Sequence, residues 1–138
     1  MIPPVSPFGL IQETLWPNKW MILVVSMMLN QTQRKQVEKV LPEFRKRWPT
    51  PEKFTQAKLE EVIDVIRPLG FYNRRSANLI AMTIRYLKGD WKDVRELPGV
   101  GQYAARSWEI FCENNLGNEP PVDHALVIYW TWASQHSI

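Results

Sequence analysis

Hydrophobic residues recur at helical spacing along most of the chain. From Trp20 to Leu29 nearly every position is apolar, which predicts a helix buried on all sides. In five further segments the apolar residues fall three, four or seven positions apart, as on one face of a helix. The predicted faces are Val37, Val40, Leu41, Phe44 and Trp48; Leu59, Val62, Ile63 and Ile66; Ala77, Ile80, Ala81 and Ile84; Ala105, Trp108 and Cys112; and Leu126, Tyr129, Trp130 and Ala133.

Proline and glycine separate these predicted helices. One helix is expected to end at Pro49, where Thr50 and Pro51 suit the cap and first turn of a short helix. No segment keeps up the apolar–polar alternation of a half-buried strand. The chain has 138 residues, of which 45% are hydrophobic. Residues 1–138 are therefore predicted to form one all-α domain with a sizeable core.

Positive charge is clustered, although its excess is small. Lys and Arg outnumber Asp and Glu by 17 to 14. Residues 31–50 are rich in Lys and Arg, and residues 65–88 contain five basic residues and no acidic one. Such clustering suits a polyanionic partner, and it equally suits a solvated helix face.

Cysteine content and hydropathy exclude several classes of protein. Cys112 is the only cysteine, so the chain has no internal disulfide and no multi-cysteine metal or iron–sulfur site. We expect Cys112 to be a buried small apolar residue. The apolar run from Met21 to Leu29 is too short to span a membrane, and the first ten residues lack the basic part of a signal peptide. An intracellular protein is expected.

A tight glycine turn in "RELPGVGQYAARSW" separates two segments that both read as helix. It is not a dinucleotide-binding fingerprint, because Ala104 takes the third glycine position and no strand precedes it. It also lacks the Gly-Lys-Ser/Thr of a Walker loop. Glycine permits left-handed backbone and the close approach of a ligand. We expect Gly99 and Gly101, with the amides of Gln102 and Tyr103, to bind a backbone phosphate of nucleic acid. The alternative is an ordinary turn between packed helices.

Several segments together resemble a known family. "LPGVGQYAA", "VDHALVIYW" and "MMLNQTQRKQV" are similar to motifs of the helix-hairpin-helix (HhH-GPD) DNA glycosylases of base excision repair. "SPFGLIQETLW", "RPLGFY" and "IFCENN" look most like the mismatch-specific thymine glycosylases that are linked to a methyl-CpG-binding domain. The resemblance implies two helical lobes with a cleft between them and no iron–sulfur cluster. Residues 20–116, with the hairpin at 97–101, would form one lobe, and 1–19 with 117–138 the other.

The resemblance also assigns the chemistry of the site. Asp123 matches the catalytic aspartate, whose carboxylate can stabilise positive charge on the sugar or activate water; from its position alone it could equally be an N-cap. Tyr103, also assigned to the catalytic centre, stands where the lyase members carry a lysine. A phenol cannot form a Schiff base, so strand cleavage is not expected.

Further residues are assigned by their place in the family motifs. Gln12, Leu29 and Tyr103 would line the pocket for the extruded base, with Gln12 reading its Watson–Crick edge; Gln12 could instead be a solvent-facing helix residue. Gln31 and Phe71 would enter the base stack, although Phe71 could equally be a core aromatic.

The remaining assignments concern the DNA backbone and ions. Arg34 and Lys35 would contact phosphates, and the carbonyls of Leu97 and Val100 could hold a monovalent cation such as Na⁺ or K⁺. No catalytic metal or other cofactor is expected. His124, beside the aspartate, is more simply explained without a catalytic duty.

The predicted function is that of a monofunctional, monomeric DNA glycosylase acting on double-stranded DNA. It would remove a mismatched or damaged pyrimidine, thymine or uracil opposite guanine, by hydrolysis. One alternative is a substrate such as 5-hydroxymethyluracil. Another is mismatched adenine, because "LNQTQ" around Gln31 also resembles the adenine glycosylases. A third is a DNA-binding protein without catalysis.

Overall fold

The computed structural model describes residues 3–136, except for the side chain of His124. Within this range every regular element is a helix and no strand forms, so the all-α prediction is confirmed. The α-helices are α1 (Ile11–Thr14), α2 (Lys19–Leu29), α3 (Arg34–Arg47), α4 (Pro51–Phe54), α5 (Leu59–Ile66), α6 (Tyr72–Lys88), α7 (Gln102–Cys112) and α8 (His124–His136); the 3-10 helices are η1 (Arg67–Leu69) and η2 (Val94–Glu96).

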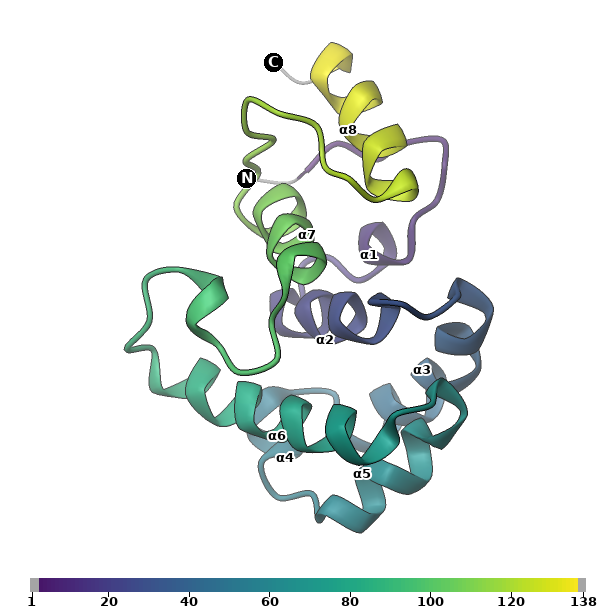
Figure 1. The fold of residues 1–138 in the computed structure, drawn as a ribbon, viewed down its shortest axis with the longest axis vertical. Helices are drawn as coiled ribbons and strands as arrows, with labels where there is room; N and C mark the ends of the chain where they lie inside the picture. The colour runs from purple at the N-terminus through teal and green to yellow at the C-terminus, as the bar shows by residue number, and fades with distance from the viewer. Residues whose placement is uncertain (1–2, 137–138) are drawn as a thin grey trace.

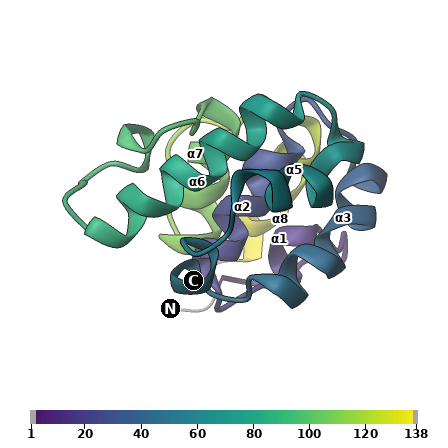
Figure 2. The same ribbon diagram turned by 90° about the horizontal axis from the view of Figure 1, so that it is seen from below.

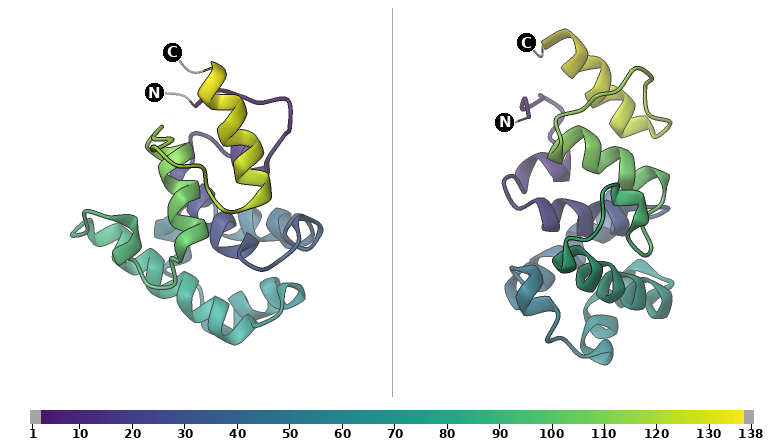
Figure 3. Two further views of the ribbon diagram at one scale, coloured as in Figure 1. Left: turned by 45° about the horizontal axis from the view of Figure 1, so that its top comes forward. Right: turned by 90° about the vertical axis from the view of Figure 1, so that its left-hand side faces the viewer.

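The helices form three tiers along the long axis of the molecule (Figure 1). Helix α8 lies at one end, α7 with α1 and α2 in the middle, and α3 to α6 at the other end (Figure 3). Seen from below, α5 and α6 lie in front of α2 (Figure 2). Helix α2 packs most extensively on α7 and also contacts α1, α3 and α6. Its residues from Trp20 to Ser26 are all buried, as the continuous apolar run predicts.

An aromatic cluster anchors the lower tier. Phe44, Phe54 and Trp48 pack with ring centroids 5.1 to 5.3 Å apart, and Trp20 of α2 joins them. The short helix α4 begins as predicted, since the Thr50 hydroxyl accepts a hydrogen bond from the Lys53 amide at 3.2 Å. The cluster joins α2 to α3, which carries the first basic segment, and to α4.

The predicted buried face of α6 is wrong by one position. Ile84 is 48% exposed, whereas Ser76, Leu79, Met82 and Thr83 face the core. Thr83 can be buried because its hydroxyl accepts from the Trp20 indole at 3.0 Å and donates to the Leu79 carbonyl at 2.8 Å. A smaller error occurs in α5, where Leu59 is 43% exposed and Val65 is buried.

The N-terminal segment is bound between α1 and α8. The Glu13 carboxylate accepts hydrogen bonds from the Ser6 amide at 2.6 Å, the Ser6 hydroxyl at 2.9 Å and the Leu10 amide at 2.7 Å. At the other side the Tyr129 hydroxyl donates to the Pro4 carbonyl at 2.5 Å. These bonds hold α1, and with it Gln12, against the middle tier.

No helix within residues 3–136 is long and apolar enough to cross a membrane.

Candidate active site

The hairpin turn contains two glycines, and their backbone conformations and surroundings differ. Gly99 has a φ of 75°, and a Cβ there would lie 2.7 Å from the Cβ of Asn78, so only glycine fits. The turn is closed by the Val100 amide, which donates to the Leu97 carbonyl at 3.2 Å. Gly101 is extended at φ −94°, so the expectation of left-handed backbone is wrong there. A Cβ on Gly101 would meet nothing within 4 Å, which leaves the surface open to a ligand.

The two arms of the hairpin differ in length. The segment before the turn, predicted to be helical, forms only the short helix η2, which Asp93 caps by accepting from the Arg95 amide at 2.8 Å. After the turn, α7 begins at Gln102, and no side chain among the described residues caps its first amides. These amides and the helix dipole form a surface that attracts anions.

A small cavity brings together the residues assigned to base binding and catalysis. Its volume is 180 Å³. The lining residues are Leu10, Ile11, Gln12, Leu29, Thr32, Arg34, Tyr103, Asp123 and Ala125. They come from α1, α2, the following loop, α3, α7 and the start of α8, so segments far apart in the sequence meet at one point.

Gln12 is a buried member of this cavity. It is 2% exposed, so the alternative of a solvent-facing helix residue is wrong. Its amide nitrogen donates to the Tyr103 hydroxyl at 3.1 Å and to the Ser107 hydroxyl at 3.3 Å. Both amide hydrogens are used in this way, and the amide oxygen, which has no donor among the described residues, is left as an acceptor.

Tyr103 is a neutral phenol at physiological pH. Burial raises its pKa to about 12, and the negative charge of Asp123 adds to this effect, while the hydrogen bond from Gln12 opposes it. The Tyr103 oxygen accepts a bond from Gln12, so its own proton is available for donation.

Asp123 caps α8. One carboxylate oxygen, Oδ2, accepts from the Leu126 amide at 3.1 Å, and the Asp123 carbonyl accepts from the Val127 amide at 2.8 Å. Oδ1 accepts no hydrogen bond from the part of the chain that the structure describes. Asp123 is therefore an N-cap that also faces the cavity, so its two interpretations are compatible.

The two residues expected to enter the base stack lie on a second cavity. Gln31 and Phe71 both line a space of 460 Å³ beside Gly99. Phe71 is 76% exposed, so the alternative that it is a core aromatic is wrong. Gln31 and Phe71 have φ values of 60° and 45°, which are rare for residues other than glycine. Such strained backbone is concentrated at functional sites.

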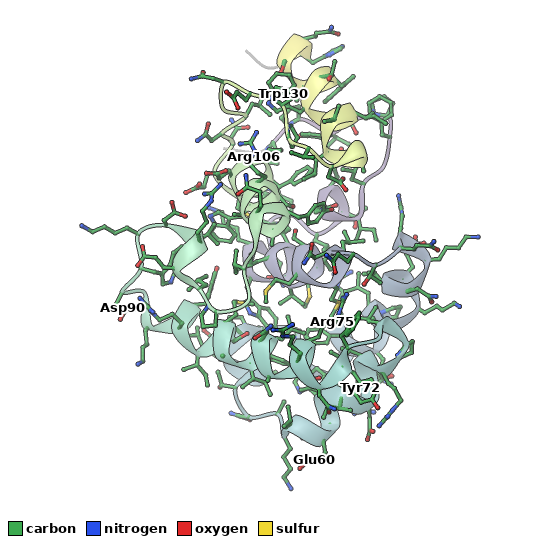
Figure 4. The ribbon with its side chains drawn as sticks, viewed as in Figure 1. Glu60, Tyr72, Arg75, Asp90, Arg106 and Trp130 are labelled. Atoms are coloured by element: carbon green, nitrogen blue, oxygen red, sulfur yellow. The ribbon has the colours of Figure 1, made fainter. Side chains whose placement is uncertain are left out.

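Arg75 has a structural role that the sequence analysis does not predict. Arg75 extends from α6 toward α2 (Figure 4). Its guanidinium donates to the Met28 carbonyl at 2.7 Å, the Asn30 carbonyl at 2.9 Å and the Thr32 hydroxyl at 2.5 Å. Burial lowers its pKa. Its partners lie more than 40 residues away, so charge clustering could suggest only a polyanion contact or a solvated helix face. Arg75 instead holds the loop that presents Gln31.

The other assigned residues lie around these cavities. Arg34 lines the smaller cavity and donates to the Gly9 carbonyl at 2.8 Å and to Glu38 at 3.2 Å. Lys35 is exposed on α3. The site suggested for a monovalent cation at the hairpin carbonyls stays a prediction, and the His124 side chain lies outside the described residues.

The glycine turn between η2 and α7, with Asp123 in the cavity beside α7, is the arrangement expected of a helix-hairpin-helix protein. The chain belongs to the HhH-GPD superfamily of base excision DNA repair proteins, whose family profile matches residues 24–126. This confirms the family resemblance.

The chain is similar to named relatives over parts of their length. It is 36% identical over 131 residues to the methyl-CpG-binding domain protein 4-like protein of Arabidopsis thaliana, covering 95% of this chain and 29% of that protein. It is 38% identical over 115 residues to the thymine-DNA glycosylase of Aeropyrum pernix, covering 78% of this chain and 51% of the relative. The structure of a thermostable thymine-DNA glycosylase superimposes with a TM-score of 0.66 at 16% identity, over 86% of this chain and 65% of that one. The last likeness supports the fold alone.

Proposed function

We propose that the chain is a monofunctional DNA glycosylase that hydrolyses the N-glycosidic bond of thymine or uracil mismatched with guanine. The observation that carries this proposal is the shared cavity of Gln12, Tyr103 and Asp123. The relatives named above, a thymine-DNA glycosylase among them, support the same substrate class.

Asp123 supplies the electrostatic part of the reaction. Cleavage of the bond between base and sugar develops positive charge on the sugar ring, which a nearby carboxylate stabilises. The N-cap bond to Oδ2 orients the carboxyl group and leaves Oδ1 to face the sugar or the attacking water. The reaction consumes only water.

Gln12 and Tyr103 present an acceptor and a donor to the extruded base. The free amide oxygen of Gln12 can accept the N3 hydrogen of uracil or thymine, and the Tyr103 proton can bond to a neighbouring carbonyl oxygen. This pairing matches the imide edge that uracil, thymine and 5-hydroxymethyluracil share. The ring nitrogen on this edge of adenine carries no hydrogen, so a Gln12 oxygen that faces the ring nitrogen favours uracil or thymine.

Strand cleavage is not part of the proposed reaction. A lyase needs an amine that attacks C1′, and none of the residues lining the 180 Å³ cavity is a lysine. By its place in the hairpin motif, Tyr103 would stand where the lyase members carry a lysine, and it is a neutral phenol. The product would be an abasic site in an intact strand.

The rest of the surface would hold the duplex. The open amides at the start of α7 would bind a phosphate, with Arg34 and Lys35 contacting others. Gln31 and Phe71 would fill the gap left by the extruded base. Extrusion costs a few kcal/mol and costs least at a mismatch, which favours such sites.

The test is base release from labelled duplexes carrying G·T, G·U, 5-hydroxymethyluracil opposite G, or A·G. We expect strand breaks at the pyrimidine only after alkali treatment, in single-turnover conditions with monomeric protein. Breaks without alkali would contradict a monofunctional enzyme. Release of adenine alone would show that mismatched adenine, and not a pyrimidine, is the substrate. No release from any duplex, despite binding, would leave the non-catalytic alternative.

A further inference from the structure

We infer that Ser26 and Ser107 form a buried hydrogen-bond relay that fixes which way the Gln12 amide faces, and that both are positioning residues for base selection. This inference rests on the proposed function of the 180 Å³ cavity. It concerns two side chains that lie behind the cavity and line no part of it.

The relay runs from the backbone of α2 to the cavity. The Ser26 hydroxyl lies 2.7 Å from the Ile22 carbonyl oxygen and 2.7 Å from the Ser107 hydroxyl. The Ser107 hydroxyl lies 3.3 Å from the amide nitrogen of Gln12. Both serines are 0% exposed, so water does not compete for these bonds.

The direction of every hydrogen bond follows from the Ile22 carbonyl. A carbonyl oxygen only accepts, so Ser26 must donate its single proton there. Ser26 can then only accept from Ser107, which uses the one proton of that hydroxyl. Ser107 is thereby left as an acceptor, and the group of Gln12 that faces it must be the NH₂.

The consequence is that the relay keeps the Gln12 amide oxygen directed away from Ser107. Rotating the amide by half a turn would bring its oxygen against the acceptor side of Ser107, with no proton between them. The cost of leaving buried polar groups unpaired in this way opposes rotation. An acceptor toward the base suits the N3 hydrogen of uracil, whereas the unprotonated N3 of cytosine needs a donor.

Removing the Ser26 hydroxyl should release this constraint. In Ser26→Ala, the Ser107 proton no longer has Ser26 as its acceptor and can be donated to the Gln12 oxygen. Both amide orientations then become available, although Ser26 itself does not touch Gln12. Ser76→Ala is the matched control, because Ser76 is also 0% exposed and its hydroxyl has no hydrogen-bond partner among the described residues.

The first experiment compares release of uracil and cytosine, each placed opposite a stable abasic analogue so that base pairing does not differ. We expect Ser26→Ala to lower the uracil-to-cytosine ratio of single-turnover rates about three- to tenfold, the effect of one hydrogen bond. The control Ser76→Ala should keep the wild-type ratio. An unchanged ratio in folded Ser26→Ala overturns the relay.

A second experiment needs no catalysis, so it separates failure of the relay from failure of the proposed function. In Gln12→Glu, the relay's acceptor at Ser107 favours the protonated carboxyl group. Adding Ser26→Ala frees a donor and should lower the proton affinity of that carboxyl roughly tenfold, measured by carbon-13 NMR titration. Adding Ser76→Ala should not. Equal titration in both double variants overturns the relay even if the wild type releases uracil.

Discussion

Replacing Arg75 by alanine should loosen the loop that presents Gln31. The guanidinium makes bonds of 2.7, 2.9 and 2.5 Å to Met28, Asn30 and Thr32. Hydrogen bonds from a charged donor contribute about 1.5–3 kcal/mol each when buried. Because Arg75 is only partly buried and water can replace some of these bonds, we expect a total loss of about 2 kcal/mol in unfolding free energy. For a domain of this size this corresponds to a fall in Tm of roughly 8 °C.

The neighbouring Arg74 provides a control of equal charge. Arg74 is exposed on the same helix, so Arg74→Ala removes the same positive charge without breaking the loop contacts. Thermal unfolding and single-turnover base release from a G·U duplex would be measured for both variants. We expect the two variants to bind the duplex with similar dissociation constants. Base release by Arg75→Ala should be about tenfold slower than by Arg74→Ala, because a misplaced Gln31 no longer holds the extruded base in position for reaction. Equal Tm and equal rates in the two variants would refute the role given to Arg75.

Two further predictions concern the hairpin and the alkaline range. Gly99→Ala should lower Tm by several degrees, because its Cβ would lie 2.7 Å from that of Asn78 at a φ of 75°. Gly101→Ala should fold normally, and it should bind DNA more weakly because its methyl group would occupy the open surface proposed for a phosphate. Thermal unfolding with fluorescence anisotropy on a duplex distinguishes them, and equal Tm values would count against the turn geometry. Because the folded-state pKa of Tyr103 is raised from 10.0 to about 12, the unfolded chain ionises first and stability should fall between those pH values. In urea unfolding at pH 8 and 11, Tyr103→Phe should lose less stability than the wild type; an equal loss would argue against the raised pKa.

The sequence predicts best what local patterns determine. The apolar run of α2, the Thr50 cap and the Gly99 turn each follow from neighbouring residues, and the structure contains them all. The predicted buried face of α6 is wrong because Thr83 is polar, and its hydroxyl bonds to the Trp20 indole, 63 residues away, as well as to the local Leu79 carbonyl. An apolar periodicity cannot detect such a residue.

The site was predicted in a similarly uneven way. Family motifs identified Gln12, Tyr103 and Asp123, which the structure places on one cavity. The supporting contacts of Gln12 span 91 and 95 residues of sequence, and no local pattern encodes them. From the sequence Arg75 is only a positive charge, because its acceptors are mostly backbone carbonyls that any residue carries.

Asp123→Asn tests the central claim most directly. Asparagine caps a helix about as well as aspartate, so the variant should fold with nearly wild-type stability and bind the G·U duplex. Only the negative charge facing the cavity is removed. The account predicts that base release, followed by alkali treatment under single-turnover conditions, falls at least a hundredfold, the scale of one electrostatic catalytic group. Base release at the wild-type rate by Asp123→Asn would contradict the assignment of the catalytic site.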